Sequence, residues 1–323
     1  MNTDLTQFNP TIDTLIEGWL YEKRMVRSGS AKTDIAYRST LNSFRATLKK
    51  GEMDIDSPDI ATLVRVAGMW ASIRVVGARL QGDVSSATYN QRLAILSSFY
   101  HYYQEQARLY DKEIVNPIPL VKKRKVQAYA GAIPIDGDEV VLLLEAIDQG
   151  TPQGQRDYVL LSVAFTTGRR GSELVNLRQR DIKVSSKKVT LTFHCKGGKI
   201  KRDTLDQDLS RVFLDYQHSI YGSLHNADAP VWVSLSRQNA GEAITIHTLY
   251  DICSSRLGVS KTHVLRHTFA VEMEKLHAPI SEISDRLGHT DEKITGIYLK
   301  QVRSAENPYA GKLANRFGIG KER

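Results

Sequence analysis

The 323-residue sequence is poor in cysteine and has no long apolar run. Its two cysteines, Cys195 and Cys253, lie far apart, so neither a disulfide framework nor a cysteine-rich zinc site is expected. No apolar stretch approaches the ~20 residues that a membrane-spanning helix needs. The N-terminus shows neither the basic start nor the apolar segment of a signal peptide. These absences predict a soluble, cytoplasmic protein without a membrane partner.

The sequence also lacks the motifs of several enzyme classes. It contains no GxxxxGK[ST] phosphate-binding loop, no carboxylate cluster and no Cys or His residues at metal-ligand spacing. We therefore expect no cofactor and no metal ion, and a metal-dependent nuclease is disfavoured.

An excess of basic residues is the main feature of the composition. The chain has 44 Lys and Arg against 36 Asp and Glu, which gives a net charge of +8 and a pI near 9.3. This balance favours an anionic partner, although charge alone does not separate nucleic acid from a membrane surface. The length suggests about two domains.

Residues 12 to about 110 show helical periodicity. Apolar residues recur at helical spacing in three segments, and the aromatic residues of 99–103 fit a packed core better than a base-stacking surface. The positions expected in this core include Leu15, Trp19, Ile35, Leu41, Phe44, Leu48, Leu93 and Phe99.

The segment NPIPLVKKRKVQ follows this helical part. It combines two prolines with four consecutive basic residues, and we place the domain boundary near residue 128. Two interpretations fit: a solvated connector, or a basic strap that crosses a phosphate backbone. The basic residues are Lys122, Lys123, Arg124 and Lys125.

A β-hairpin is the clearest strand signal of the second half. The segment VTLTFHC alternates apolar and polar residues, and IKRDTL is the expected return strand. Between them, KGGK predicts a tight turn at Gly197 and Gly198, with Lys196 and Lys199 beside it. Most of the remaining sequence predicts helices, and Gly288 is the expected left-handed stop of the helix in SEISDRLGHT.

The stretch HVLRHTFA, residues 263–270, concentrates two imidazoles and a guanidinium. If it is helical, His263 and Arg266 are neighbours on one face, while Leu265, Phe269, Met273 and Leu276 form the buried stripe. Taken alone, the segment also fits an ordinary core helix with a solvated polar face.

Four stretches together show a more specific pattern: TGRRGSELVNLRQRDI, CKGGKIKR, HVLRHTFA and LGHTDEKITGIY. They supply Arg, Lys, His-x-x-Arg, Gly-His and Tyr in that order, with spacings of three, 23 and nine residues from His263 to Tyr298. Over residues 135 to 300 the sequence resembles the tyrosine recombinases, also called the phage-integrase family. Arg169 occupies the variable position before the matching arginine, and Thr204 stands where the family usually has proline. The matching residues are Arg170, Lys196, His263, Arg266, His289 and Tyr298.

The resemblance implies a mainly α fold that closes around DNA as a C-shaped clamp. It divides the chain into a helical, SAM-like core-binding domain (1–116) and a basic linker (117–133). An α+β catalytic domain with a small antiparallel sheet (134–300) and a tail helix for subunit contacts (301–323) follow. The tail carries Tyr309, Leu313 and Phe317 at i, i+4 and i+8, and this stripe docks on a neighbouring subunit or on its own domain.

The resemblance also implies that the protein cuts and rejoins DNA through a 3′-phosphotyrosyl intermediate. Tyr298 is then the nucleophile and His263 its base, while Lys196 protonates the departing 5′ oxygen. Arg170, Arg266 and His289 hold the non-bridging oxygens of the phosphate. DNA contacts are expected from Lys122, Lys123, Arg124, Lys125 and Lys199.

The implied partners are double-stranded DNA with inverted-repeat core sites and three further copies of the chain, in a homotetramer. The implied task is integration, excision or resolution of a mobile element or replicon, including transposition. Two alternatives remain open from the residues: a type IB topoisomerase-like enzyme that relaxes DNA, and a DNA-binding regulator that keeps the fold without catalysis.

Overall fold

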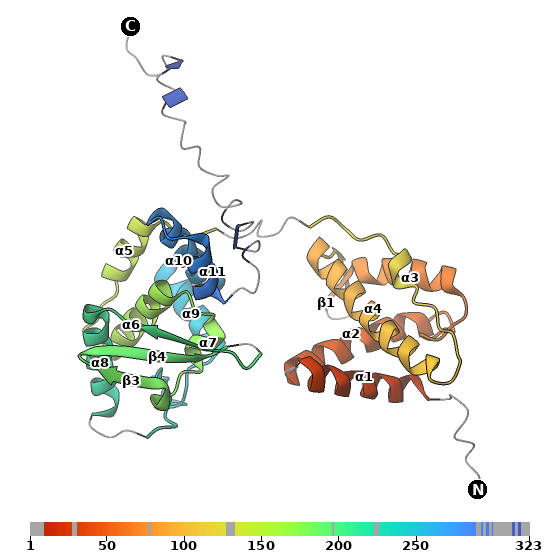
Figure 1. Cartoon of the computed structure of the whole chain (residues 1–323), viewed down its shortest axis with the longest axis horizontal. Helices are drawn as coiled ribbons and strands as arrows, with labels where there is room; N and C mark the ends of the chain where they lie inside the picture. Colours follow the sequence, from red (N-terminus) through yellow and green to blue (C-terminus); the bar gives the residue numbers. More distant parts are fainter. Residues whose placement is uncertain are drawn as a thin grey trace. The chain divides into compact units, whose positions relative to one another are not determined.

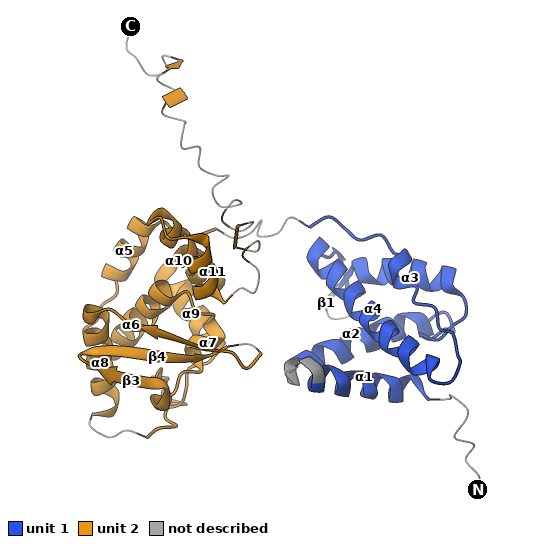
Figure 2. Ribbon diagram, in the orientation of Figure 1, with its two compact units in different colours: residues 1–127 blue, residues 128–323 orange. Residues whose placement is uncertain are grey.

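A computed structural model describes residues 10–27, 31–76, 79–126, 133–195, 197–222, 226–288, 292, 295–296, 299, 312–313 and 316–317. The chain divides into two compact units, residues 1–127 and residues 128–323 (Figure 2). Each unit has its own apolar core. Among the described helices, none is both long and apolar enough to span a bilayer.

Unit 1 is built on four helices (Figure 1): α1 (Ile12–Arg27), α2 (Ala31–Lys49), α3 (Ile60–Ser72) and α4 (Ser86–Arg108). The aromatic residues that the sequence placed in the core are buried there, and Trp19 meets Phe99 edge to face with ring centroids 5.8 Å apart. Ile35, expected in the core, is 69% exposed, so that prediction was wrong. At 100° per residue, Ile35 lies on the side of α2 opposite Leu41 and Phe44.

A two-stranded hairpin interrupts the helices of unit 1. Strand β1 (Ile73–Val76) pairs antiparallel with β2 (Arg79–Asp83), between α3 and α4. We expected helices throughout this part. The β-branched run IRVV was the available signal, because such residues favour strands over helices.

The chain that leaves unit 1 stays packed against it for several residues. A 3₁₀ turn, η1 (Ile118–Leu120), is followed by Val121, and both Ile118 and Val121 are buried. The Asn90 side chain accepts from the backbone N–H of Arg124 at 2.9 Å and donates to its carbonyl at 2.7 Å. The first part of the predicted linker is therefore an edge of unit 1.

Unit 2 surrounds a three-stranded antiparallel sheet with helices. The sheet order is β3-β4-β5, and Val189, Leu191 and Phe193 of β4 are buried, as the alternation predicted. The expected mainly α fold with a small antiparallel sheet is confirmed. The elements are α5 (Gly137–Glu145), α6 (Pro152–Thr167), α7 (Gly171–Val175), η2 (Gln179–Asp181), β3 (Ile182–Ser185), β4 (Lys188–His194), β5 (Ile200–Thr204), α8 (Gln207–Tyr221), α9 (Ile246–Leu257), α10 (His263–Lys275) and α11 (Ile280–Leu287).

Helix α10 contains the stretch HVLRHTFA and presents its apolar side to the core. Leu265 and Phe269 are buried, as expected, but Leu276 is 78% exposed. The prediction for Leu276 was wrong because α10 ends at Lys275, so the helical stripe does not reach it.

Candidate active site

A left-handed turn after α6 positions the first arginine pair. Gly168 has φ +61°, and a Cβ at this position would lie 2.3 Å from Cδ1 of Phe269. Both the dihedral and the close packing therefore require glycine. The turn ends α6 abruptly and places Arg169 and Arg170 directly before α7.

A buried carboxylate orients Arg170. Glu173, 5% exposed, accepts from the backbone N–H of Arg170 and from its guanidinium, both at 2.9 Å. The Arg170 side chain is 35% exposed, so part of its guanidinium faces solvent. The turn and Glu173 together hold this charge in one orientation.

Arg266 on α10 joins two other parts of the site. Its guanidinium donates to the Gly168 carbonyl oxygen at 3.0 Å and to the Leu287 carbonyl oxygen. The pKa of Arg266 is lowered to about 10, mainly by burial and secondly by the positive charge of Arg170. The side chain still carries its charge at neutral pH. It therefore adds a second cation beside the turn that carries Arg170.

His263 lies one turn before Arg266 on the same helix. Loss of water around the ring lowers its pKa below the ordinary 6.5, and the positive charges of Arg266 and Arg170 act in the same direction. The imidazole is therefore neutral at pH 7 and can accept a proton. His267, with its ring centroid 6.0 Å from that of His263, has its pKa lowered to about 4, chiefly by burial.

A basic pocket of about 190 Å³ opens beside the turn. Its lining, as far as the described residues define it, has four cationic side chains and no carboxylate, which suits an anion such as a phosphate. Over the described part of the chain, no group of three or more His, Cys, Asp or Glu residues could hold a metal ion. The pocket is lined by Arg169, Arg170, Cys195, Lys199, Lys201, Leu287 and Gly288.

Three predicted site residues, Lys196, His289 and Tyr298, lie outside the described residues. The structure does place some of their sequence neighbours. Gly288 ends α11 in the predicted left-handed conformation, φ +65°, and lines the basic pocket. Leu299 is buried with Phe269 of α10 and with Ile283 and Leu287 of α11.

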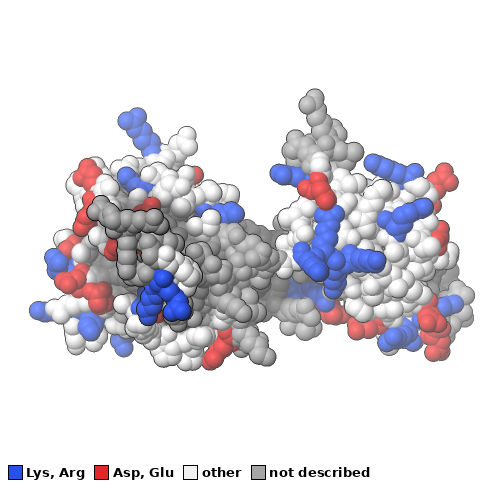
Figure 3. Space-filling view, turned by 90° about the horizontal axis from the view of Figure 1, so that it is seen from above, with Lys and Arg blue, Asp and Glu red and all other residues white. Residues whose placement is uncertain are grey.

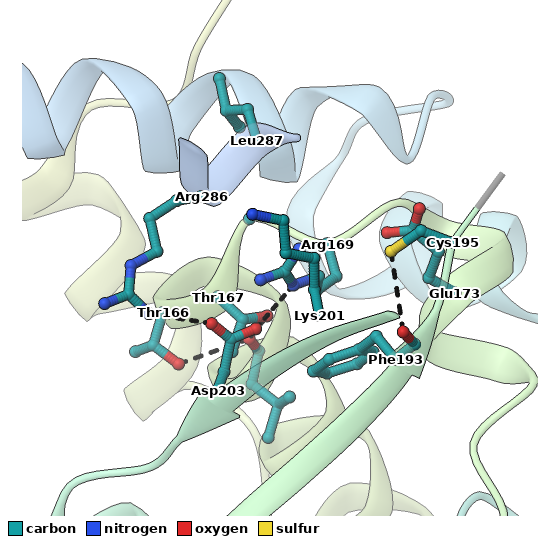
Figure 4. Close-up of polar contacts among 12 residues, drawn as sticks. Thr166, Thr167, Arg169, Glu173, Phe193, Cys195, Lys201, Asp203, Arg286 and Leu287 are labelled. Carbon is teal, nitrogen blue, oxygen red and sulfur yellow. Dashed lines mark hydrogen bonds and ion pairs between the residues drawn. The ribbon is translucent and has the colours of Figure 1, made fainter. Parts of the chain in front are cut away.

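An ionic cluster around a buried carboxylate, beside the pocket, was not predicted. Asp203 on β5 pairs with Arg169 at 2.6 Å and with Arg286 of α11 at 3.0 Å (Figure 4). We call these three residues the Asp203 cluster. No local pattern indicates the pairing, because the partners stand 34 and 83 residues apart in the sequence.

The predicted DNA-contacting residues differ in their surroundings. Lys122, Lys123, Lys125 and Lys199 are exposed. Arg124 is engaged within unit 1: its guanidinium lies 4.2 Å from the centroid of the Tyr89 ring and pairs with Asp83 at 3.0 Å. On the face of unit 1 that Figure 3 presents, Lys and Arg side chains gather in a group.

The described site thus brings two guanidinium groups, of Arg170 and Arg266, and a neutral histidine to one glycine turn. Comparison with known proteins gives the family. The model described as "Phage integrase family" matches residues 134–304, so the chain belongs to the phage integrase family and is a tyrosine recombinase, an enzyme of site-specific DNA recombination.

Relatives are found along most of the chain. The XerC tyrosine recombinase of Staphylococcus saprophyticus is 24% identical over 289 residues, which cover 89% of this chain and 92% of the relative. The XerC of Staphylococcus haemolyticus is 28% identical over 226 residues, 67% of this chain and 71% of the relative.

Solved structures share the fold. The XerH site-specific recombinase, bound to a palindromic difH substrate in a post-cleavage complex, aligns with a TM-score of 0.65 at 17% identity. The alignment covers 95% of this chain and 84% of XerH. A lambda integrase dimer bound to a COC′ core site aligns with a TM-score of 0.58 at 18% identity, over 90% of this chain and 78% of that one.

Proposed function

We propose that this recombinase cuts and rejoins double-stranded DNA by attack of Tyr298 on a backbone phosphate. The Tyr298 oxygen forms a bond to phosphorus while the bond from phosphorus to the 5′ oxygen breaks, which leaves a 3′-phosphotyrosyl link. One observation carries the proposal: Arg170 and Arg266 are both held at the Gly168 turn, beside a pocket whose described lining residues are basic or uncharged.

Each residue of the set has a distinct task in this step. Arg170 and Arg266, with His289, stabilise the negative charge that grows on the non-bridging oxygens. A phenol with a pKa of ~10 must lose its proton during attack, and the neutral His263 accepts it. Lys196 gives a proton to the 5′ oxygen as it leaves. The energy of the phosphoester bond is kept in the protein–DNA link, so rejoining requires no ATP or other nucleotide cofactor.

The helical part over residues 1–116 serves as the core-binding domain, and both units contact the DNA. Lys122, Lys123 and Lys125, with Lys199, contact phosphates, and Arg124 fixes the strap to unit 1. The structure of XerH on palindromic difH supports inverted-repeat core sites for this chain as well. The bacterial relatives support action in the cytoplasm.

The active assembly is a homotetramer on two DNA sites, joined by the tail over residues 301–323. Leu313 is 39% exposed and Phe317 is 66% exposed, so neither finds full cover on its own chain. The hydrogen bond from Phe317 N–H to Leu313 O, 2.9 Å, shows the helical i, i+4 relation that aligns the two side chains. A short apolar helix of this kind gains stability by docking on a neighbour.

A covalent-adduct assay on a nicked suicide substrate tests the function. The wild-type chain should become linked to DNA, whereas Tyr298→Phe should bind the same DNA with unchanged affinity and form no adduct. Tyr309→Phe is the matched control and should still react. If Tyr298→Phe still forms the adduct and Tyr309→Phe does not, the nucleophile is Tyr309. Relaxation of plasmids regardless of sequence would favour the topoisomerase alternative.

A further inference from the structure

Arg169 contacts both strands of the hairpin that leads to and from residue 196. Its guanidinium lies 5.3 Å from the centroid of the Phe193 ring on β4 and pairs with Asp203 on β5. Arg169 is 3% exposed and Asp203 is 4% exposed, so water screens this ion pair little. The turn that carries Arg170 is thus fixed to the base of the hairpin.

The Asp203 cluster also ties the hairpin to α11. Arg286 pairs with the second oxygen of Asp203 and with Glu282 of its own helix at 2.8 Å. A parallel contact runs from Lys201 to Asp285 at 2.6 Å. Figure 4 shows Arg169 and Arg286 both directed toward the Asp203 carboxylate. Three parts of the structure therefore meet at the buried Asp203 carboxylate: the turn that carries Arg169 and Arg170, strand β5 and helix α11.

At the far end of the hairpin, the described glycines are surrounded by open space. Gly197 and Gly198 have φ +79° and +73°, and a Cβ added to either would meet no atom within 4 Å. From Asp203 to Gly198 the strand extends about 17 Å, at ~3.3 Å per residue. A tilt of about 4° at the base moves that end by about 1 Å, and such a misplacement can lower a catalytic rate by ~10²-fold.

We propose that the Asp203 cluster is a positioning device, which orients the hairpin so that the leaving-group acid reaches the 5′ oxygen. The inference deepens the proposed function, because it relies on Lys196 as that acid. Asp203 and Arg286 touch neither the phosphate nor the reacting oxygens. They act through the orientation of the β4–β5 hairpin. When the bond from phosphorus to the 5′ oxygen breaks, the proton passes from Lys196 Nζ to that oxygen only if the hairpin keeps its orientation relative to the turn that carries Arg170.

The test compares two DNA substrates in single-turnover cleavage. One has an ordinary phosphate, and the other has a 5′-bridging phosphorothiolate, whose sulfur leaves without protonation. Asp203→Asn should slow cleavage of ordinary DNA by up to ~10²-fold and should slow the phosphorothiolate reaction far less. Half-site DNA binding should be unchanged. Asp285→Asn is the matched control, since it removes an exposed carboxylate that contacts the same strand, and it should react like wild type.

Lys196→Ala separates failure of the inference from failure of the proposed function. If Lys196→Ala regains activity on the phosphorothiolate but Asp203→Asn is slowed equally on both substrates, the positioning role is overturned and the lysine assignment stands. If Lys196→Ala is not rescued, the acid assignment is overturned and the inference with it. Wild-type rates for Asp203→Asn on both substrates would also overturn the inference.

The Asp203→Asn substitution leaves Arg169 buried with a weakened partner, so this variant can fail to fold. A second variant covers that case. Arg169→Met combined with Asp203→Leu replaces the buried pair by apolar side chains of similar volume, which proteins commonly tolerate. Arg286 keeps Glu282 as its partner. This double variant should unfold at a temperature near that of wild type, cleave ordinary DNA slowly and regain activity on the phosphorothiolate. Normal cleavage of ordinary DNA by the folded double variant would overturn the proposal.

Discussion

Arg266 donates a hydrogen bond to the carbonyl oxygen of Gly168 at 3.0 Å, so one cation of the site holds the turn that carries the other. A guanidinium has five N–H donors in a rigid plane, and this bond fixes that plane beside Arg170. The charges that we propose to contact the phosphate are thus oriented by the backbone before any DNA binds. Such preorganisation is the main source of transition-state stabilisation by fixed charges.

Loss of the Arg170 guanidinium should impair chemistry far more than binding. Arg170→Ala should lower the single-turnover cleavage rate by ~10²- to 10³-fold, or ~3–4 kcal/mol, because one donor to the developing charge is removed. Arg170→Lys should recover little of the cleavage rate, since an ammonium group cannot replace the planar, paired N–H donors of a guanidinium. Arg180→Ala, which removes a surface arginine paired with Asp228, is the control and should cleave normally.

Cleavage should depend on pH through His263. Its folded-state pKa lies below 6.5, so the imidazole is neutral and competent at pH 7 and becomes protonated as the pH falls below that value. The cleavage rate should therefore be flat near neutrality and decline on the acid side. His263→Asn should be slow at every pH and should lose this acid limb. An unchanged acid limb in the variant would assign the titration to another group.

Stability should fall in acid because of His267. Its pKa is about 4 in the folded protein against 6.5 for the free side chain, so the unfolded chain binds more protons between these values. The free energy of unfolding should therefore decrease as the pH falls from 6.5 and level off near 4. His267→Asn should flatten this decline. Urea unfolding of both proteins at several pH values measures it.

The exposed lysines of the strap should determine part of the salt dependence of DNA binding. Each phosphate contact contributes ~0.9 to the slope of log K against log salt, so replacing Lys122, Lys123 and Lys125 by alanine should reduce the slope by up to ~2.7. Alanine at Lys183, Lys187 and Lys188, exposed on β3 and β4 and their turn, removes the same charge elsewhere. An equal effect of both triple variants would indicate net charge rather than contacts.

Removal of the tail stripe should affect assembly and leave stability unchanged. Leu313 and Phe317 are exposed, so the double alanine variant should keep its free energy of unfolding within ~0.5 kcal/mol. It should bind one half-site as a monomer but lose cooperative pairing of two sites and strand exchange. Gel-shift and recombination assays distinguish these steps. A large loss of stability would show that the tail belongs to its own core.

Local patterns in the sequence were enough to predict the hairpin of β4 and β5 and the end of α11 at Gly288. The alternation in VTLTFHC indicated β4, because a strand with one buried face places every second residue inside. Gly288 was predicted as a helix stop from its residue type alone, and its φ of +65° confirms it. Both features depend on residues within a few positions of one another.

Contacts between distant segments could not be predicted in this way. The partner of Arg169 is Asp203 on strand β5. Only the packing of β5 against the turn that carries Arg169 brings the two residues together. The β1 and β2 hairpin was missed because a short β-branched run between two helices is weak evidence for a strand. The roles of Lys196, His289 and Tyr298 remain predictions from the family resemblance.

The separate cores of the two units have an evolutionary consequence. Among the described residues, Trp19, Phe44 and Phe99 belong to the core of unit 1, whereas Leu174 of α7 and Leu265 of α10 belong to the core of unit 2. Mutations that reshape the helical unit therefore leave the geometry of the arginines intact. Under the proposed function, natural selection can alter the choice of DNA sites through the helical unit while the chemistry is conserved, so descendants of one ancestral gene can acquire new targets.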